Sequence, residues 1–189
     1  MFQVRIHGRG GQGVVTAAEL LAQSAFDEKR FAQAFPSFGS ERTGAPVVSF
    51  CRIADAEIRV REPIMFPDAL IIQDSTLLKQ VDVFAGLKSD GYALINSTRT
   101  FEQLGIADLA DNRTRFITVP ATAMAMEHLG RPVPNAVLLG AFAALTKVIS
   151  LDSVTNAIRE KFKPKIAAYN CAAATAAYEF VLAMVPADA

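Results

Sequence analysis

Short apolar runs of strand length alternate along the chain with segments whose apolar residues recur at helical spacing. The first run, Phe2 to Ile6, is followed by a helical pattern from Val14 to Phe26 and by a second run from Phe31 to Phe35. Two strands joined through a helix normally lie parallel with a right-handed crossover. The sequence therefore predicts a β-α-β unit over residues 2–35.

The same alternation continues downstream. Buried strands are expected at Ala69 to Gln73, Tyr92 to Ile95 and Arg115 to Val119, and helices at Leu77 to Phe84, Phe101 to Ala110, Thr122 to Leu129, Asn135 to Ile149, Ser150 to Phe162 and Lys165 to Val185. Continuous apolar runs are typical of strands covered on both faces. The pattern predicts an α/β fold with a doubly wound, mostly parallel, Rossmann-like sheet and C-terminal helices, in a single domain over residues 1–189.

An extra pair of strands is expected before the third buried run. Residues Pro46 to Ile53 and Ala56 to Val60 alternate between apolar and polar on either side of Ala54-Asp55, which predicts an inserted β-hairpin. The predicted hairpin would expose the arginines Arg52, Arg59 and Arg61. They would form a solvated face or contact an anionic ligand or an acidic partner surface.

The composition excludes several classes of function. The 19 basic and 19 acidic residues give a formal net charge of +0, without the basic excess of a nucleic-acid-binding protein. No leader pattern and no uncharged apolar run of ~18 residues is apparent, so we expect a cytoplasmic protein without a membrane span. Cys51 and Cys171 are too few for an iron–sulfur cluster, which usually takes ~4 thiolates, and no metal-ligand spacing occurs. Both cysteines are expected in the core.

A glycine turn follows the first predicted strand and precedes the first helix. Its sequence, Gly8-Arg9-Gly10-Gly11-Gln12-Gly13, satisfies the pattern G-x-G-x-x-G. In this context backbone N–H groups and a helix N-terminus converge on a phosphate or another anion. An NAD site would also need an acidic residue ~20 residues further on. The chain offers Gln33 there, followed by Ala34-Phe35-Pro36, which argues against an NAD-dependent dehydrogenase.

A second loop rich in turn formers follows the second predicted strand. It runs Pro36-Ser37-Phe38-Gly39-Ser40-Glu41-Arg42-Thr43-Gly44-Ala45-Pro46. A loop at the carboxyl edge of a parallel sheet lies where ligands bind. Candidates for a general acid or base near these loops are His7, Glu41 and Asp74. A structural role is favoured for His7, and a helix N-cap role for Asp74.

Together the two loops resemble the paired signatures of the gamma subunit of 2-oxoacid:acceptor oxidoreductases. The resemblance is carried by Ile6 to Val14 and Pro36 to Pro46, by their spacing, by the arginine-containing hairpin and by the buried strand ending in Gln73-Asp74. Ser40 departs from the proline of many relatives. It implies a multisubunit enzyme that oxidatively decarboxylates a 2-oxoacid on thiamine diphosphate and releases an acyl-coenzyme A. Electrons would pass through iron–sulfur clusters to ferredoxin or NAD. This chain is not expected to be active alone.

The resemblance also implies a division of roles among the subunits. Thiamine diphosphate and the clusters would belong to the partners, namely the thiamine-binding alpha and beta subunits and a ferredoxin-like delta subunit. This chain would help to form the coenzyme A site and the subunit interface. On that basis the binding residues would be Gly8, Gly10, Gly11, Gln12, Gly13, Ser37, Gly39, Glu41, Arg42 and Gly44. The glycines allow close backbone approach, Arg42 offers a fork to a phosphate or carboxylate, and Glu41 would anchor Arg42 or reach another subunit.

Two alternatives stay open at this point. The chain could be the small subunit of an indolepyruvate oxidoreductase, which has a similar fold. It could also be a docking subunit without a ligand of its own, in which both loops only shape an interface. Neither the 2-oxoacid, with pyruvate and phenylglyoxylate as examples, nor any catalytic residue can be assigned from this sequence.

Overall fold

A six-stranded mixed sheet forms the centre of the molecule. The computed structural model describes residues 1–37, 43–110 and 115–184. The strands are β1 (Phe2–Arg9), β2 (Phe31–Pro36), β3 (Pro46–Ala54), β4 (Ala69–Ile72), β5 (Tyr92–Asn96) and β6 (Phe116–Val119). Their order is β2-β3-β1-β4-β5-β6, with β1, β4, β5 and β6 parallel and β3 antiparallel to both neighbours. The predicted α/β class with a mostly parallel sheet is confirmed.

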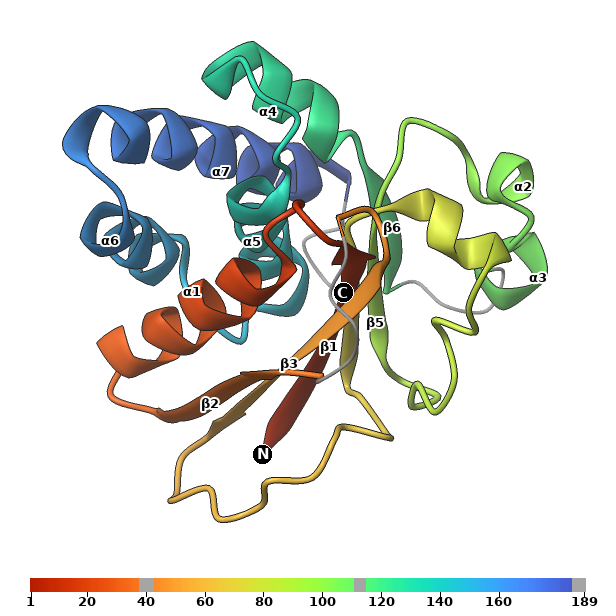
Figure 1. Ribbon diagram of the computed structural model, residues 1–189, viewed down its shortest axis with the longest axis horizontal. Coiled ribbons are helices and arrows are strands. Elements are labelled where there is room, and N and C mark those ends of the chain that lie inside the picture. Colours follow the sequence, from red (N-terminus) through yellow and green to blue (C-terminus); the bar gives the residue numbers. More distant parts are fainter. Residues whose placement is uncertain (38–42, 111–114, 185–189) are drawn as a thin grey trace.

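Helices cover both faces of this sheet (Figure 1). They are α1 (Val14–Asp27), the 3₁₀ helix η1 (Ser75–Lys79), α2 (Phe101–Leu104), α3 (Ala107–Ala110), α4 (Ala121–Leu129), α5 (Asn135–Thr146), α6 (Leu151–Lys161) and α7 (Pro164–Met184). One face packs against α1 and the helices α4 to α7, and the other against η1, α2 and α3. The two predicted helices on this second face are shorter than expected, since Gly105 ends α2 and the helix expected at residues 77–84 is a single 3₁₀ segment.

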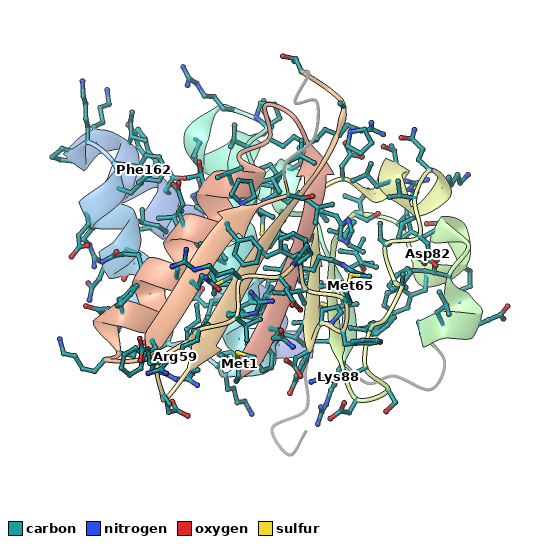
Figure 2. All side chains as sticks on the ribbon, turned by 60° about the horizontal axis from the view of Figure 1, so that its bottom comes forward. Met1, Arg59, Met65, Asp82, Lys88 and Phe162 are labelled. Carbon is teal, nitrogen blue, oxygen red and sulfur yellow. The ribbon has the colours of Figure 1, made fainter. Side chains whose placement is uncertain are left out.

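The predicted hairpin is wrong, because β3 pairs with β2 and β1 and residues 56–60 form no strand. The prediction that Arg52 is exposed is also wrong, since this residue is only 2% exposed. Its guanidinium donates to the carbonyl oxygens of Val60 and Glu62, which fastens the segment after β3 onto the sheet. Arg59 is exposed as predicted (Figure 2), with a side chain that is 85% accessible, and it forms an ion pair with Glu57.

The position of β3 separates the two strands of the predicted β-α-β unit. β1 and β2 have the same direction, but β3 lies between them and leaves β2 at the sheet edge. In a dinucleotide-binding fold the second strand lies directly beside the first. The place where an acidic residue would meet a ribose is therefore one strand further away. On the other side, β1 leads to α1 and its neighbour β4 leads to η1 on the opposite face, so a topological switch point lies between them.

The α5–α7 contact depends on close backbone approach. Every residue of α5 is buried, and α7 buries a small-residue stripe of Ala167, Asn170, Ala173, Ala174, Ala177 and Val181. A Cβ placed on Gly140 of α5 would lie 1.9 Å from the carbonyl oxygen of Ala174. Among the helices of the described residues, only α7 is long and apolar enough to cross a membrane. It packs on α5 through its small-residue stripe, with a third of its most apolar stretch buried, and the absence of a membrane span stays a prediction.

Candidate ligand-binding site

The glycine turn delivers the chain from the carboxyl end of β1 into the first turn of α1. Gly13 is the N-cap of this helix and has a φ of 73°, in the left-handed region that favours glycine. It has no side chain to cap the first turn, and that turn contains no acidic residue. The N–H groups at a helix N-terminus lack intrahelical acceptors and lie at the positive end of the helix dipole. The turn is therefore suited to receive an anion.

Backbone hydrogen bonds bring the two sequence motifs together. The Gly10 N–H donates to the carbonyl oxygen of Ala45 (2.9 Å), and the Gly44 N–H donates to that of Gly10 (3.1 Å). Between the turn, α1 and this segment lies a cleft of about 460 Å³. Its lining includes Gly10, Gly11, Gly13, Val15, Thr16 and Thr43. The structure thus places the glycine turn and the end of the second loop around one cavity.

The remaining predicted binding residues have different positions. Gly8 lies near the end of β1 and faces α1. A Cβ at this position would come 2.5 Å from Cγ2 of Val14, so the glycine permits close packing of α1 against β1. Ser37, at the start of the second loop, is exposed, and its N–H donates to the carbonyl oxygen of Val48 in β3. Gly39, Glu41 and Arg42 lie outside the described residues.

Gln12 uses its side chain within the turn itself. Its Oε1 accepts from the N–H of Arg9 (2.8 Å), and its Nε2 donates to Oδ2 of Asp74 (2.9 Å). These bonds connect the turn to the end of the neighbouring strand β4. Gln12 therefore holds the shape of the turn instead of presenting a free amide.

Arg9 is a key residue of the site that sequence reasoning missed. Its guanidinium donates to four acceptors: Asp74 Oδ2 (3.1 Å), the Gly44 carbonyl oxygen (3.0 Å), Thr76 Oγ1 (2.7 Å) and Gln80 Oε1 (2.9 Å). Arg9 thus clamps the glycine turn, the second loop and η1 together. The available signal was an arginine enclosed by two glycines, which pattern analysis treats as a free position of the motif.

Asp74 serves as an ionised acceptor. Its Oδ1 accepts from the N–H of Thr76 (2.9 Å), which confirms the predicted N-cap role for the η1 segment. Partial burial raises the pKa of Asp74, but hydrogen bonds from Thr76 and Gln12 and the charge of Arg9 outweigh it and hold this pKa below its usual value. A carboxylate occupied in this way is a poor general acid near neutral pH.

The side chain of His7 lies on the face of β1 that is turned away from α1. It is 6% exposed, and its Nε2 accepts from Nε of Arg5 (3.0 Å). Burial, assisted by the charge of Arg5, lowers the pKa of His7 to about 3. The Arg5 guanidinium also donates to the carbonyl oxygens of Val83 (2.9 Å) and Ala85 (2.6 Å). The pair fastens a distant segment to the sheet, in agreement with the structural role favoured for His7.

The buried His7 should make the chain acid-sensitive. Its pKa of about 3 lies below the value of about 6.5 for unfolded histidine, so the unfolded state binds more protons between these values. The stabilising contribution is complete above pH 6.5, and we expect a loss of about 1.4 kcal/mol per pH unit below pH 6. Denaturant unfolding of the full chain at pH 7 and pH 5 measures this loss. His7→Gln retains an acceptor for Arg5 and should reduce the difference; an equal difference in both proteins would contradict the assignment.

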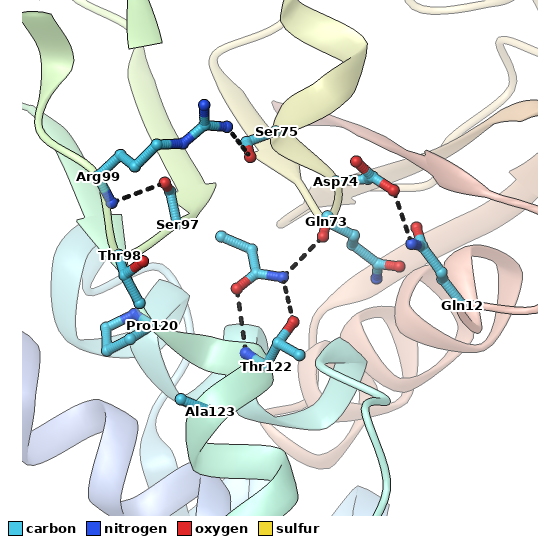
Figure 3. A pocket seen from close by; sticks show the side chains of 11 residues that line it. Gln12, Gln73, Asp74, Ser75, Ser97, Thr98, Arg99, Pro120, Thr122 and Ala123 are labelled. Carbon is cyan, nitrogen blue, oxygen red and sulfur yellow. Dashed lines mark hydrogen bonds between the residues drawn. The ribbon is translucent and has the colours of Figure 1, made fainter. Parts of the chain in front are cut away.

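A second recess, of about 290 Å³, lies at the carboxyl ends of β4, β5 and β6 (Figure 3). Asn96 organises its floor, because its Nδ2 donates to the Gln73 carbonyl oxygen (2.8 Å) and Thr122 Oγ1 (2.7 Å) and its Oδ1 accepts from the Thr122 N–H (3.1 Å). On the rim, Nη2 of Arg99 donates to Oγ of Ser75 (3.2 Å). The recess and the glycine cleft are neighbours on one edge of the sheet.

The described residues do not provide a metal centre. They contain no group of three or more histidine, cysteine or acidic side chains that could hold a metal ion. Cys51 is buried in β3, where burial raises the pKa of its thiol, and Cys171 is half-buried in α7. The expected core position is confirmed for Cys51 and is only partial for Cys171.

Comparisons with known proteins agree over nearly the whole chain. A family described as pyruvate ferredoxin/flavodoxin oxidoreductase matches residues 3–180. Pyruvate synthase subunit PorC of Methanothermobacter marburgensis is 48% identical, over 95% of this chain and 97% of its own length. The pyruvate/ketoisovalerate oxidoreductases common subunit gamma of Pyrococcus abyssi is 43% identical, over 95% of this chain and 96% of its own.

Solved structures show the same similarity. Pyruvate oxidoreductase subunit PORC from Thermotoga maritima aligns with a TM-score of 0.82 and 33% identity, over 94% of this chain and 95% of that chain. The fold also occurs in 2-oxoglutarate:ferredoxin oxidoreductase from Magnetococcus marinus, solved with 2-oxoglutarate, coenzyme A and succinyl-CoA bound. There the TM-score is 0.76 at 18% identity, over 96% of this chain and 31% of that chain.

Proposed function

Because this chain belongs to the pyruvate ferredoxin/flavodoxin oxidoreductase family, as the gamma subunit of a pyruvate or 2-oxoacid:ferredoxin oxidoreductase, we propose that its glycine turn forms part of the coenzyme A site. The assembled enzyme would decarboxylate the 2-oxoacid oxidatively on thiamine diphosphate and release an acyl-coenzyme A. Relatives named for pyruvate and ketoisovalerate favour an aliphatic 2-oxoacid, with pyruvate first, over indolepyruvate or phenylglyoxylate.

One observation carries this proposal: the uncapped N-terminus of α1 opens into the glycine cleft. The phosphates of coenzyme A are anions, and glycines without side chains let such groups approach the backbone closely. Of the predicted binding residues, Gly10, Gly11 and Gly13 line the cleft. The glycine cleft, with its free helix N-terminus, thus fits the phosphate-bearing end of coenzyme A.

In the mechanism, this chain would bind and orient rather than transfer protons. Coenzyme A, when bound, supplies the thiol that accepts the acyl group. The N–H groups of Gly11, Gly13 and the first turn of α1 would hold its phosphates, since those of Arg9, Gly10 and Gln12 already have acceptors within the chain, and the Arg9 clamp would keep the turn in shape. Apart from Arg9, the described residues that line the cleft are glycines, valines and threonines, which do not titrate near neutral pH.

Thiamine diphosphate and the iron–sulfur clusters would be held by the partner subunits. Two cysteines on separate elements, β3 and α7, cannot supply the usual ~4 thiolates of a cluster. Ferredoxin is the proposed electron acceptor and the cytoplasm the proposed location.

A charge at the start of α1 tests the proposal. Thr16→Glu places a carboxylate in the first turn, beside the cleft, where it should repel a phosphate while favouring the helix itself. In the assembled enzyme we expect at least a tenfold higher KM for coenzyme A, equivalent to about 1.4 kcal/mol, and an unchanged KM for the 2-oxoacid. The measurement is 2-oxoacid-dependent ferredoxin reduction at varied coenzyme A.

Thr16→Gln is the matched control, since it has the size of glutamate without the charge, and its KM for coenzyme A should stay close to wild type. If Thr16→Glu assembles normally and binds coenzyme A as well as the control does, the docking alternative is favoured. That alternative has its own support, because the side chains of Arg9 and Gln12 are occupied by internal contacts.

A further inference from the structure

The terminal helix α7 presents an apolar face that no other described element covers. The helix packs on α5 and touches α4 and α6 (Figure 1), yet only 33% of its most apolar stretch is buried. Four large hydrophobic side chains, Ile166, Tyr169, Leu182 and Met184, are between 46% and 53% exposed. A helix that is apolar all round is normally covered on every side. The outer face of α7 therefore indicates a partner.

The outermost stripe of this face consists of small residues. Ala168, Ala172 and Ala176 follow one another at intervals of one turn, on the side of α7 opposite the stripe that it buries. Ala168 and Ala172 are exposed, and Ala176 is half-buried. Side chains as small as a methyl group let a second helix approach to about 8 Å between the axes, the short end of the usual range.

The two charges of α7 are placed symmetrically about Ala172. Lys165 and Glu179 are the only charged residues of the helix, and both are exposed. They lie seven positions before and seven after Ala172, and a step of seven residues falls within about 20° of two full turns. Both charges therefore lie on the face of Ala172, about 10 Å from it in opposite directions. Neither forms an ion pair with a described residue.

We propose that this face of α7 binds α7 of a second copy of the chain, antiparallel about a two-fold axis at Ala172. A two-fold interface uses the same surface patch on both sides. Lys165 would then meet Glu179 of the second copy, and Glu179 would meet Lys165 of the second copy. Along the same contact, Ala168 would meet Ala176 and Ala172 would meet its own equivalent. Charges of one sign, or charges spaced unevenly about the small residues, would not match in this way.

The charge pattern also decides which kind of partner fits. A helix that lies on a membrane surface carries an excess of lysine and arginine on its polar face, whereas α7 carries one charge of each sign. Such a self-complementary pattern fits a second copy of the same surface. The residues that line the glycine cleft and the recess lie between positions 9 and 123, so none belongs to α7. The inference is therefore independent of the proposed coenzyme A site.

Cysteine cross-linking of the full chain tests the position of the axis. In a Cys171→Ser background, which removes the neighbouring half-buried thiol, Ala172→Cys should form a disulfide with its own equivalent when copper phenanthroline is the oxidant. Ala183→Cys is the matched control, because it is exposed on the same face but would lie about 30 Å from its own equivalent. We expect the Ala172→Cys dimer to form at least tenfold faster. Equal rates would indicate random collision and would overturn the proposed axis.

Charge reversal tests the identity of the partner. Sedimentation of the full chain should show a monomer–dimer equilibrium, and Glu179→Lys should weaken it about tenfold because Lys165 then faces a lysine. Adding Lys165→Glu restores opposite charges, so the double variant should dimerise as wild type does. All three proteins should share one denaturant midpoint, since both positions are exposed. A double variant that dimerises no better than Glu179→Lys would overturn the inference. So would a wild-type chain that stays monomeric, whether its α7 face then binds another subunit, lipid vesicles or nothing.

Discussion

Gly140→Ala should destabilise the chain by about 3 kcal/mol, although alanine is the better helix former. In the interior of a helix this substitution normally stabilises by about 1 kcal/mol. Here the new Cβ would lie 1.9 Å from the carbonyl oxygen and 2.6 Å from the carbonyl carbon of Ala174. Because both atoms belong to the backbone of α7, no side-chain rotation relieves the contact, and α5 and α7 must move apart. A loss of stability would therefore show that the backbones of α5 and α7 are in close contact, whereas a gain would reflect helix propensity alone.

Denaturant unfolding of the full chain measures this change through the midpoint, provided the m-value stays constant. Ala174→Gly should not rescue Gly140→Ala, since removing a methyl group leaves the opposing carbonyl in place. Ala172→Gly, at an exposed position of α7, is the control for helix propensity and should cost about 1 kcal/mol. A more stable Gly140→Ala protein would refute the close approach of the two helices.

Arg9→Lys should weaken both stability and coenzyme A binding, although it keeps the positive charge. One ammonium group cannot reach Asp74, Gly44 and the η1 acceptors together, so the three segments lose their common clamp. We expect a loss of about 1 to 2 kcal/mol for Arg9→Lys and about 3 kcal/mol for Arg9→Met, which leaves the carboxylate of Asp74 without its cation. The KM for coenzyme A should rise in the same order.

A double-mutant cycle with Asp74→Asn separates the ion pair from the rest of the clamp. Arg9→Met and Asp74→Asn should be less than additive in free energy of unfolding, because their side chains are in contact at 3.1 Å. Strict additivity, or an Arg9→Lys enzyme with wild-type stability and KM, would show that the contacts of Arg9 contribute little.

The sequence predicted the parallel half of the sheet because β4, β5 and β6 are short, largely apolar runs and β1 carries Phe2, Val4 and Ile6 directly before the glycine turn. It failed at residues 46–60, where local alternation resembles a hairpin. The partners of β3 are instead β1, up to 51 positions earlier in the chain, and β2. Strand pairing across such separations leaves no local pattern. The burial of Arg52 was equally hidden, since its acceptors include backbone carbonyls of an irregular segment.

The candidate site was predictable as two loops, and the structure joins them through backbone hydrogen bonds of Gly10 with Gly44 and Ala45. What the sequence could not indicate is which polar groups are used internally. Gln12 was expected to face a ligand, but its amide bonds Asp74, 62 positions away. Conversely, Gln73 stands in a hydrophobic run, and only the packed structure leaves its amide unpaired.

The antiparallel strand β3 also determines where the second loop begins and ends. Because β3 begins beside the end of β1, the connection from β2 must return to the sheet edge that bears the glycine turn, whatever its sequence. Its far end is anchored by backbone bonds from Gly44 and Ala45 to Gly10, and its near end by the Ser37 N–H. Both ends of the second loop are therefore held beside the glycine turn by backbone hydrogen bonds, which do not depend on the side chains at the bonded positions.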